Sequence, residues 1–303
     1  MSASATGPVI AAVDGRERSA DAVALARVLA GALGVPAAVA NVYVTEPLTP
    51  GPLGDEVRAL QREDAERVVA QAAQAGDEGE PLERHVTGAS SAGRGLEKLA
   101  GDCGAACVVL GSSRRGALGR VLPGSASERL LNGAPCPVAV APAGYAAGSA
   151  PRRLTTVAVA YDGTPEAARA LRWAGAVAAR AGARVVLLHS VAPTAPREHR
   201  ELYASFTEYI HGWARGELER GERTLPAGVA VETRVVEGEA AEALAKAAEQ
   251  AGADLLVTGS RGHGPVARVL LGGTSAALVR RAALPVVVVP RGAEEHGGAA
   301  GDG

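Results

Sequence analysis

Two glycine-rich segments hold the residue types that can bind a phosphate group. One runs from Gly111 to Ser125 and the other from Gly259 to Thr274. Glycine has no Cβ, so the backbone there can turn sharply and approach a ligand closely. Each segment ends where a helical pattern begins, and free N–H groups at a helix N-terminus attract an anion. Ser125 or Thr274 can equally cap that helix without any ligand, so this alternative stays open.

An aspartate followed by glycine ends the first apolar run in each half of the chain. These aspartates are Asp14 and Asp162. Such a carboxylate can accept hydrogen bonds from ribose hydroxyls or hold a divalent cation. It can equally cap the following helix or form an Asx-turn, and both interpretations remain open. The pattern is neither a G-x-G-x-x-G fingerprint nor a lysine-bearing P-loop, so the signal lies in the combination of aspartate and glycine loop.

These residues occur twice because the chain repeats itself. The segment Val9–Gly15 reappears as Val157–Gly163, 148 positions later, and Pro137–Pro142 reappears as Pro285–Pro290 at the same offset. A constant offset indicates a tandem duplication. We therefore expect a first domain at residues 1–145, a linker at 146–154, a second domain at 155–291 and a disordered tail at 292–303.

Each half alternates short apolar runs with amphipathic helical patterns, which predicts an α/β fold with a parallel sheet. Near-continuous apolar strands are typical of sheets buried on both faces, with ligand sites at the carboxyl ends of the strands. The expected strands lie near residues 9–13, 37–43, 82–86, 107–110 and 138–141, and near 156–160, 184–188, 229–236, 255–258 and 286–289. The expected helices lie near 22–33, 57–72, 93–102 and 125–131, and near 165–181, 197–220, 239–251 and 275–281.

Composition narrows the classes of function. The chain has 303 residues, 47% of them hydrophobic, a formal net charge of −2 and 3% aromatic residues. It is long enough for two cores and has no bulk charge to attract nucleic acid or a membrane. No apolar run reaches the roughly 20 residues that span a bilayer, and no signal-peptide pattern is present. Three cysteines, an odd number, indicate free thiols in the cytoplasm, and the scarcity of lysine is typical of a GC-rich bacterial genome.

Taken together, these motifs resemble the universal stress protein family. The resemblance lies in the first strand ending in Asp-Gly, in a loop of pattern G-x2-G-x9-G-[ST], and in the closing Pro-Val-x-Val-x-Pro strand. It covers residues 8–142 and 155–290. It implies two tandem open five-stranded parallel sheets of flavodoxin or Rossmann type, each with strand order 3-2-1-4-5 and helices on both faces. In one branch of the family the glycine loop binds ATP, with or without Mg²⁺, and in another branch it does not.

Both halves depart from the family's loop pattern. Arg114 stands at the second glycine position of the first half, and Gly273 stands at the hydroxyl position of the second. A lost hydroxyl removes about 0.5–1.5 kcal/mol, whereas an arginine side chain fills the space meant for phosphate, so we expect the second half to bind better. The resemblance assigns the backbone of Val42 and Ser190 to contacts with adenine. The candidate nucleotide-binding residues are Asp14, Val42, Gly111, Arg114, Gly124 and Ser125 in the first half and Asp162, Ser190, Gly259, Gly262, His263, Gly272, Gly273 and Thr274 in the second.

The leading hypothesis is a cytosolic sensor or regulator of the stress response that binds an adenine nucleotide. No catalytic-looking histidine recurs in the repeat, so slow ATP hydrolysis is the most activity we expect. A scaffold that binds proteins and no nucleotide is the alternative, and it would explain the altered loop motifs. An adenylating or flavin-linked enzyme is disfavoured because the repeat leaves no residues for a substrate domain.

Two further expectations concern contacts. The fifth strands, Pro137–Pro142 and Pro285–Pro290, are apolar on both faces and would be exposed edges. We expect them to dock the halves into an intramolecular pseudo-dimer, and a homodimer is also conceivable. The helix near residues 197–220 carries Tyr203, Phe206, Tyr209 and Trp213 on one face. We expect this face to pack in the core, with a partner surface as the alternative.

Overall fold

The structure is a computed structural model that describes residues 7–45, 52–74, 81–112, 129–131, 133–148, 153–192, 204–260 and 272–291. The first half contains β1 (Val9–Ala12), α1 (Arg18–Leu33), β2 (Ala37–Val44), α2 (Pro52–Gln74), β3 (Glu83–Ala89), α3 (Ala92–Asp102), β4 (Cys107–Gly111) and β5 (Val138–Ala141). The second contains β6 (Thr156–Ala160), α5 (Pro165–Ala181), β7 (Arg184–Val191), α6 (Ala204–Glu222), β8 (Val231–Glu237), α7 (Ala240–Gln250), β9 (Leu255–Gly259), α8 (Gly273–Arg281) and β10 (Val286–Val289). The helix expected at 125–131 lies mostly outside the described residues.

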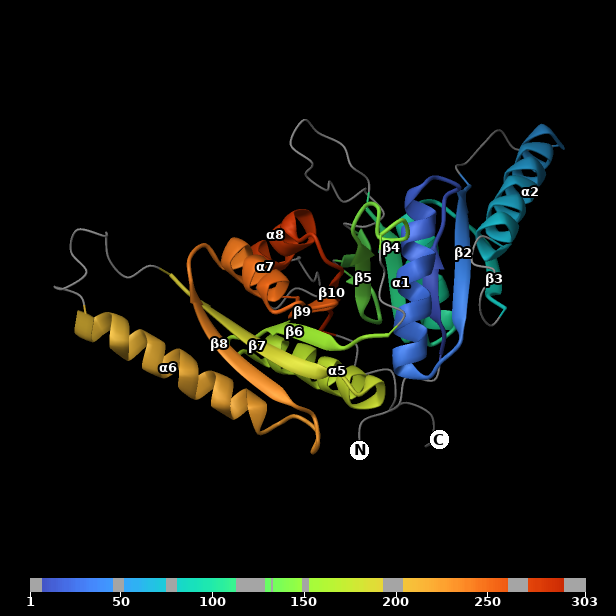
Figure 1. Cartoon of the computed structure of the whole chain (residues 1–303). Helices are drawn as coiled ribbons and strands as arrows, with labels where there is room; N and C mark the ends of the chain where they lie inside the picture. The colour runs from blue at the N-terminus through green and yellow to red at the C-terminus, as the bar shows by residue number, and fades with distance from the viewer. Residues whose placement is uncertain are drawn as a thin grey trace, which may run out of the picture.

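The strands form one ten-stranded sheet in the order β3-β2-β1-β4-β5-β10-β9-β6-β7-β8. Each half therefore has the expected 3-2-1-4-5 order, with parallel pairing inside the half. At the joint β5 and β10 pair antiparallel, with Val140 opposite Val286 and Val138 opposite Val288. Because the joint is antiparallel, the carboxyl ends of the strands in the two halves face opposite edges of the sheet. Figure 1 shows β5 and β10 side by side between the two groups of helices.

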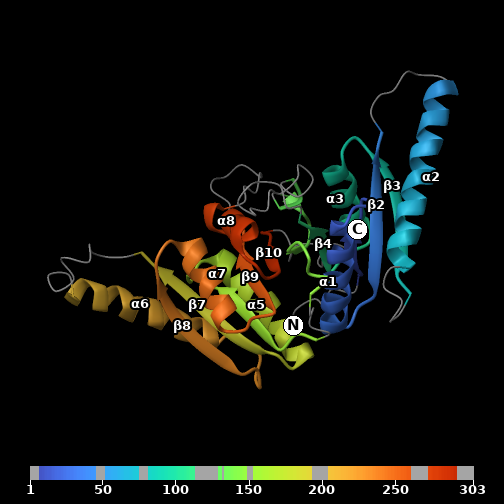
Figure 2. The same cartoon turned by 45° about the horizontal axis from the view of Figure 1, so that its top comes forward.

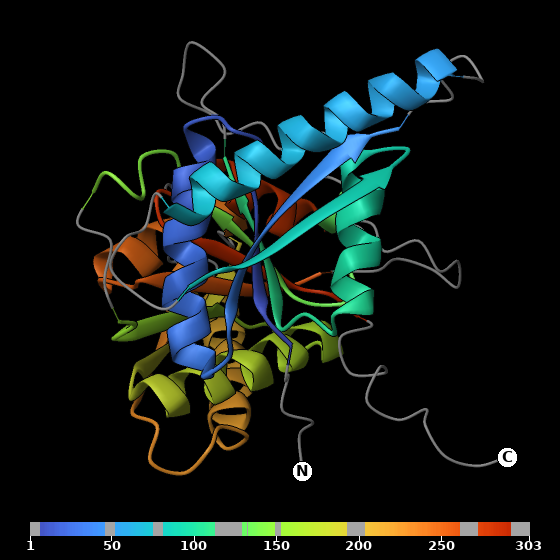
Figure 3. The same ribbon diagram turned by 90° about the vertical axis from the view of Figure 1, so that its right-hand side faces the viewer.

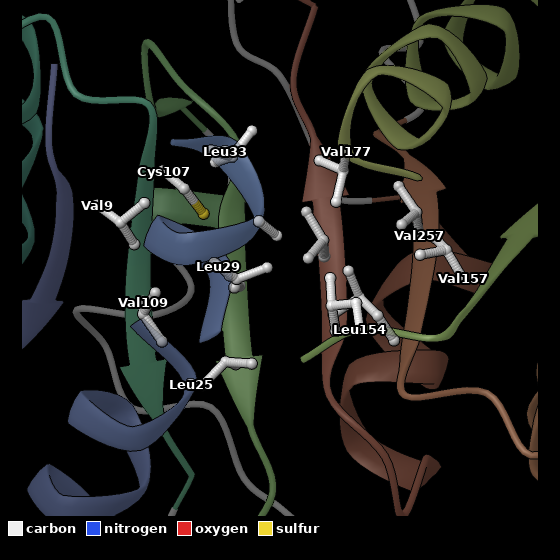
Figure 4. Close-up of a cluster of buried hydrophobic side chains, with 14 of the residues drawn as sticks. Val9, Leu25, Leu29, Leu33, Cys107, Val109, Leu154, Val157, Val177 and Val257 are labelled. Atoms are coloured by element: carbon white, nitrogen blue, oxygen red, sulfur yellow. The ribbon is translucent and has the colours of Figure 1, made fainter. Parts of the chain in front are cut away.

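The core lies on both faces of this sheet, as its buried strands require. On one face α1 packs Leu25 and Leu29, both fully buried, over the first-half strands. On the same face the second half contributes Val157 and Val257, also fully buried. Figure 4 shows these side chains in one cluster that runs across the joint. The halves are also linked by a hydrogen bond of 3.0 Å from Arg180 Nη1 at the end of α5 to the carbonyl oxygen of Leu33.

The duplication is visible in the helix ends. Helices α1 and α5 are followed by Gly34 and Gly182, with φ of 67° and 66°. This left-handed conformation favours glycine and lets the cap N–H bond a carbonyl of the last turn. Thr164 begins α5 by accepting a hydrogen bond from the Ala167 N–H, with Pro165 at the first helical position. Proline there has no N–H to leave unpaired, which explains why α5 begins where the sequence predicts.

The aromatic face of α6 is not in the core. Phe206, Tyr209 and Trp213 are 53%, 69% and 48% exposed, and Tyr203 lies outside the described residues. The expectation of core packing is therefore wrong for these three. The residues that α6 buries, Ala214, Leu218 and Gly221, all lie in its C-terminal half. Figures 1 and 2 show α6 and α2 at opposite ends of the molecule, and Figure 3 shows α2 running past the end of β2.

The cysteines behave as small apolar residues. All three are free; Cys107 and Cys136 are buried, and Cys103 is half-buried. Burial raises the pKa of Cys136 to about 12, so its thiol stays protonated and unreactive at neutral pH. In the part of the chain that the structure describes, no helix is long and apolar enough to cross a membrane.

Candidate functional site

The two aspartates lie at the carboxyl ends of β1 and β6, as the repeat predicts. The chain turns directly after each of them at Gly15 and Gly163, which have φ of 75° and 78°. Only glycine adopts this conformation at little cost, so the glycine sets the direction in which the chain leaves the strand. Each aspartate therefore stands at the edge of the sheet where an open parallel sheet binds its ligands.

Asp14 is held by four hydrogen bonds from its own chain. Its Oδ1 accepts from the Arg16 N–H at 3.2 Å and from the Ser19 hydroxyl at 3.1 Å. Its Oδ2 accepts from Arg18 Nε at 2.9 Å and also from Arg18 Nη2. Burial alone would raise the pKa of Asp14, but Arg18, with the Arg16 backbone and the Ser19 hydroxyl, holds it below its usual value. This carboxylate is an anion with its oxygens already engaged.

Asp162 has a different neighbourhood around the same turn. Its Oδ1 accepts from the Thr164 N–H at 3.2 Å and from the Thr164 hydroxyl at 2.6 Å. In both halves the bond from the N–H two residues on is an Asx-turn, so the structural interpretation of these aspartates holds whatever else they bind. The residue equivalent to Arg18 is Glu166, which forms ion pairs with Arg169 at 3.2 Å and Arg291 at 3.5 Å.

In each half a polar side chain of the second strand hydrogen-bonds the backbone of the residue just before the aspartate. In the first half Asn41 Nδ2 donates to the Val13 carbonyl oxygen at 2.7 Å. In the second half His189 hydrogen-bonds the backbone of Tyr161, and its ring meets that of Trp213 edge-on, with centroids 5.4 Å apart. Burial lowers the pKa of His189 below its usual value although the charges of Asp162 and Glu217 oppose this. His189 is thus a neutral residue with a structural partner.

The predicted adenine contacts, Val42 and Ser190, follow directly on these two polar residues. Both are half-buried. Val42 pairs with Thr87 of β3, and Ser190 pairs with Val236 of β8. They therefore lie near the carboxyl ends of the second strands, at the same sheet edge as the aspartate of their own half.

The fourth-strand glycines have a packing role. A Cβ at Gly111 would overlap the carbonyl oxygen of Arg18, and a Cβ at Gly259 would overlap that of Glu166. The first turn of α1 or α5 lies directly against the strand end, and only glycine leaves room for it. Contact between these glycines and phosphate stays a prediction.

The first turn of α8 contacts the end of β9, the fourth strand of the second half. Gly272 is the N-cap residue, Gly273 is exposed and Thr274 is half-buried. The buried hydroxyl of Ser275 donates to the carbonyl oxygen of Gly259 at 2.8 Å. Gly272 has no side chain, so it cannot occupy the N–H groups of the first turn itself. Sequence reasoning missed Ser275, although Ser127 at the equivalent position of the first half signals it.

The remaining candidates, Arg114, Gly124, Ser125, Gly262 and His263, lie outside the described residues. The structure thus brings together Gly259 and the first turn of α8 in the second half. The middle of both loops lies outside the described residues. Among the described residues, no group of three His, Cys, Asp or Glu side chains could hold a metal ion.

Comparison with known proteins agrees with this arrangement. The model of the universal stress protein family matches residues 6–142 and again residues 154–290. A universal stress protein of Mycobacterium tuberculosis is 30% identical over 241 residues, which cover 78% of this chain and 80% of that protein. One from Thermus aquaticus is 34% identical over 140 residues, covering 44% of this chain and 97% of that protein.

A solved structure shares the architecture over nearly the whole length. The crystal structure of a universal stress protein from Archaeoglobus fulgidus matches with a TM-score of 0.64 and 22% identity, over 94% of this chain and 97% of that one. At this identity the likeness concerns the fold alone. The two matches of the family model, together with the relative from Mycobacterium tuberculosis, show that the chain belongs to the universal stress protein family and carries two such domains in tandem.

Proposed function

We propose that the protein is a cytoplasmic regulator of the stress response that binds an adenine nucleotide, ATP with or without Mg²⁺, in its second half. The observation that carries this proposal is the start of α8. Its N-cap is a glycine, and Ser275 ties its first turn to the end of β9 at 2.8 Å. The N–H groups and dipole of such a turn favour a phosphate.

The other groups have roles that fit the same ligand. Asp162 would accept from the ribose hydroxyls, and the backbone at Ser190 would meet adenine. Gly262 and His263 would complete the loop around the phosphates. The described residues offer no metal cluster, so Mg²⁺ would depend on the phosphates for most of its ligands. We expect at most slow hydrolysis, because no catalytic-looking histidine recurs in the two halves as a general base.

Titration calorimetry with ATP and Mg²⁺ tests this proposal. We expect Gly262→Arg to abolish most binding because a side chain would fill the phosphate volume. Gly31→Arg is the matched control: it adds the same charge on α1, where a Cβ meets nothing within 4 Å. Undiminished ATP affinity in Gly262→Arg would put the site elsewhere, and no ATP binding by the unmodified chain would refute the proposal.

A protein-binding scaffold is the second candidate function. The exposed aromatic face of α6 favours it, since Phe206, Tyr209 and Trp213 lie one turn apart on one face and are about half exposed or more. A homodimer through this face would be seen by light scattering as twice the chain mass, and Tyr209→Glu should abolish it. A monomer at all concentrations would exclude the homodimer.

A further inference from the structure

The aspartate of the first half is bound by donors from the segment that directly follows it, up to the start of α1. A carboxylate offers about four acceptor positions. Asp14 uses them on the Arg16 N–H, the Ser19 hydroxyl and two nitrogens of Arg18. A ribose hydroxyl therefore has no acceptor there until one of these donors leaves.

Arg18 is the donor most able to leave, and it is also well placed to return. Its side chain and that of Asp14 keep 31% and 33% of their exposure, so solvent and ligand can reach the pair. Its backbone is fixed, because its carbonyl oxygen lies where a Cβ of Gly111 would be. Arg18 thus stands between the end of β1 and the end of β4, the first-half equivalents of the strand ends that carry the ribose contact and the phosphate loop in the proposed function.

We propose that Arg18 is a specificity-determining residue that closes the first-half site to ribonucleotides by occupying the oxygen of Asp14 that a ribose would need. This inference rests on the proposed function. The second half has Glu166 at the equivalent position, and a carboxylate cannot donate to Asp162. Its charge is instead paired with Arg169 and Arg291.

The size of the expected change in affinity follows from the competition between Arg18 and a ribose hydroxyl for the carboxylate of Asp14. A ligand hydroxyl must displace a charge-assisted, two-nitrogen contact made within one helical turn. Exposed ion pairs of this kind contribute up to about 1 kcal/mol, which corresponds to about fivefold in affinity. The penalty falls on ligands that use the ribose hydroxyls and spares those that lack them.

Titration calorimetry on variants of the full chain separates the effect of Arg18 on nucleotide affinity from the effect of the glycine loops. We expect Gly262→Arg to silence the second half, and Arg114→Gly removes the arginine that stands at the second glycine position of the first half. In this background we expect Arg18→Gln to tighten ATP about fivefold and to leave the affinity for 2′,3′-dideoxy-ATP unchanged. Arg16→Gln is the matched control, because the Arg16 side chain is 65% exposed and lies 3.8 Å from Asp14. It should leave both affinities unchanged.

Each outcome decides between the two proposals. An equal gain for both nucleotides would mean that Arg18 obstructs by bulk, and no gain would mean that it does not obstruct; either result overturns the inference alone, provided that the unmodified chain binds ATP. No ATP binding by the unmodified chain overturns the proposed function and this inference with it. Thermal melting of each variant, expected to match its parent, checks that the fold is retained.

Discussion

The two candidate sites share a backbone and differ in charge. Both have an Asx-turn at the aspartate, a positive-φ glycine after it, and a fourth-strand glycine packed against the next helix. In the first half the basic side chain of Arg18 binds Asp14. In the second half the charges that act on the nearby His189 ring are acidic, those of Asp162 and Glu217. Duplication has therefore preserved the features that turn the chain and has changed the side chains that decide what the edge of the sheet can bind.

The helices that follow the second strands show the same division. A Cβ at Gly15 would lie 3.2 Å from the Val68 side chain of α2, and one at Gly163 would overlap the Glu217 carboxylate of α6. The turn is the same in both halves, but an apolar contact faces it in one and an acidic contact in the other.

The largest effect should come from breaking the joint between the halves. Val287 is fully buried and pairs with Ala139 across β5 and β10. We expect Val287→Asp to lower the free energy of unfolding by at least about 3 kcal/mol, because the charge would be buried without a partner. Urea denaturation measures this, and small-angle scattering would show whether the halves separate. Val44→Asp, at a site 40% exposed, is the control and should change stability little. Equal effects of the two changes would mean that the joint is not buried in solution.

The second effect tests whether the fourth-strand glycines serve packing. Gly259→Ala should cost about 1–3 kcal/mol, because its Cβ would meet the Glu166 carbonyl. Gly273→Ala should cost nothing or stabilise slightly, since a Cβ there meets nothing within 4 Å and the residue is helical. Thermal denaturation of both variants makes the comparison. Similar melting temperatures would contradict the packing role.

A third effect would sharpen the difference between the two aspartates. We expect Asp162→Ala to weaken ATP binding by about 1–2 kcal/mol, the range for a hydrogen bond to a charged group. Asp14→Ala should leave ATP binding unchanged, because Arg18 already engages that carboxylate. Calorimetry on the two variants checks this. Greater loss in Asp14→Ala would reverse the assignment of the halves.

The smallest effect concerns pH. The folded pKa of His189 is lowered, so the unfolded chain binds more protons as the pH falls below the ordinary value of 6.5. Stability should therefore be complete above pH 6.5 and decrease below it. His189→Asn, which copies Asn41 of the first half, should reduce this loss. Chemical denaturation at pH 7.5 and 5.5 measures it, and the same slope in both proteins would contradict a neutral buried ring.

Much of the fold could be predicted because buried strands have a simple pattern. The strand order within each half followed from the resemblance to the universal stress protein family, and α5 begins and ends where glycine, proline and threonine place it. The sequence shows that α6 has an aromatic face but not whether that face is buried. Periodicity tells which residues share a face and does not tell what covers it. In α6 only residues of the C-terminal half are buried, and the aromatic face stays exposed.

The site was predicted less completely for a related reason. A glycine that leaves room for a ligand and a glycine that leaves room for a neighbouring backbone carbonyl look alike in sequence. Gly259 is an example, because a Cβ there would overlap the carbonyl oxygen of Glu166. Ser275 acts through a contact with Gly259, 16 positions away, that forms only when α8 is placed beside the end of β9. Arg18 contacts Asp14 only four positions away, but the choice of this partner depends on the turn between them. The domain boundaries stay a prediction.

The joint between β5 and β10 also has a consequence for how the protein responds to dilution. Two separate domains that met through the same four-residue strands would come apart at low concentration. Here the chain between Ala141 and Thr156 keeps the partner strand nearby, at an effective concentration in the millimolar range that does not depend on copy number. Each chain thus carries its two unlike candidate sites in a fixed one-to-one ratio, facing opposite edges of one sheet.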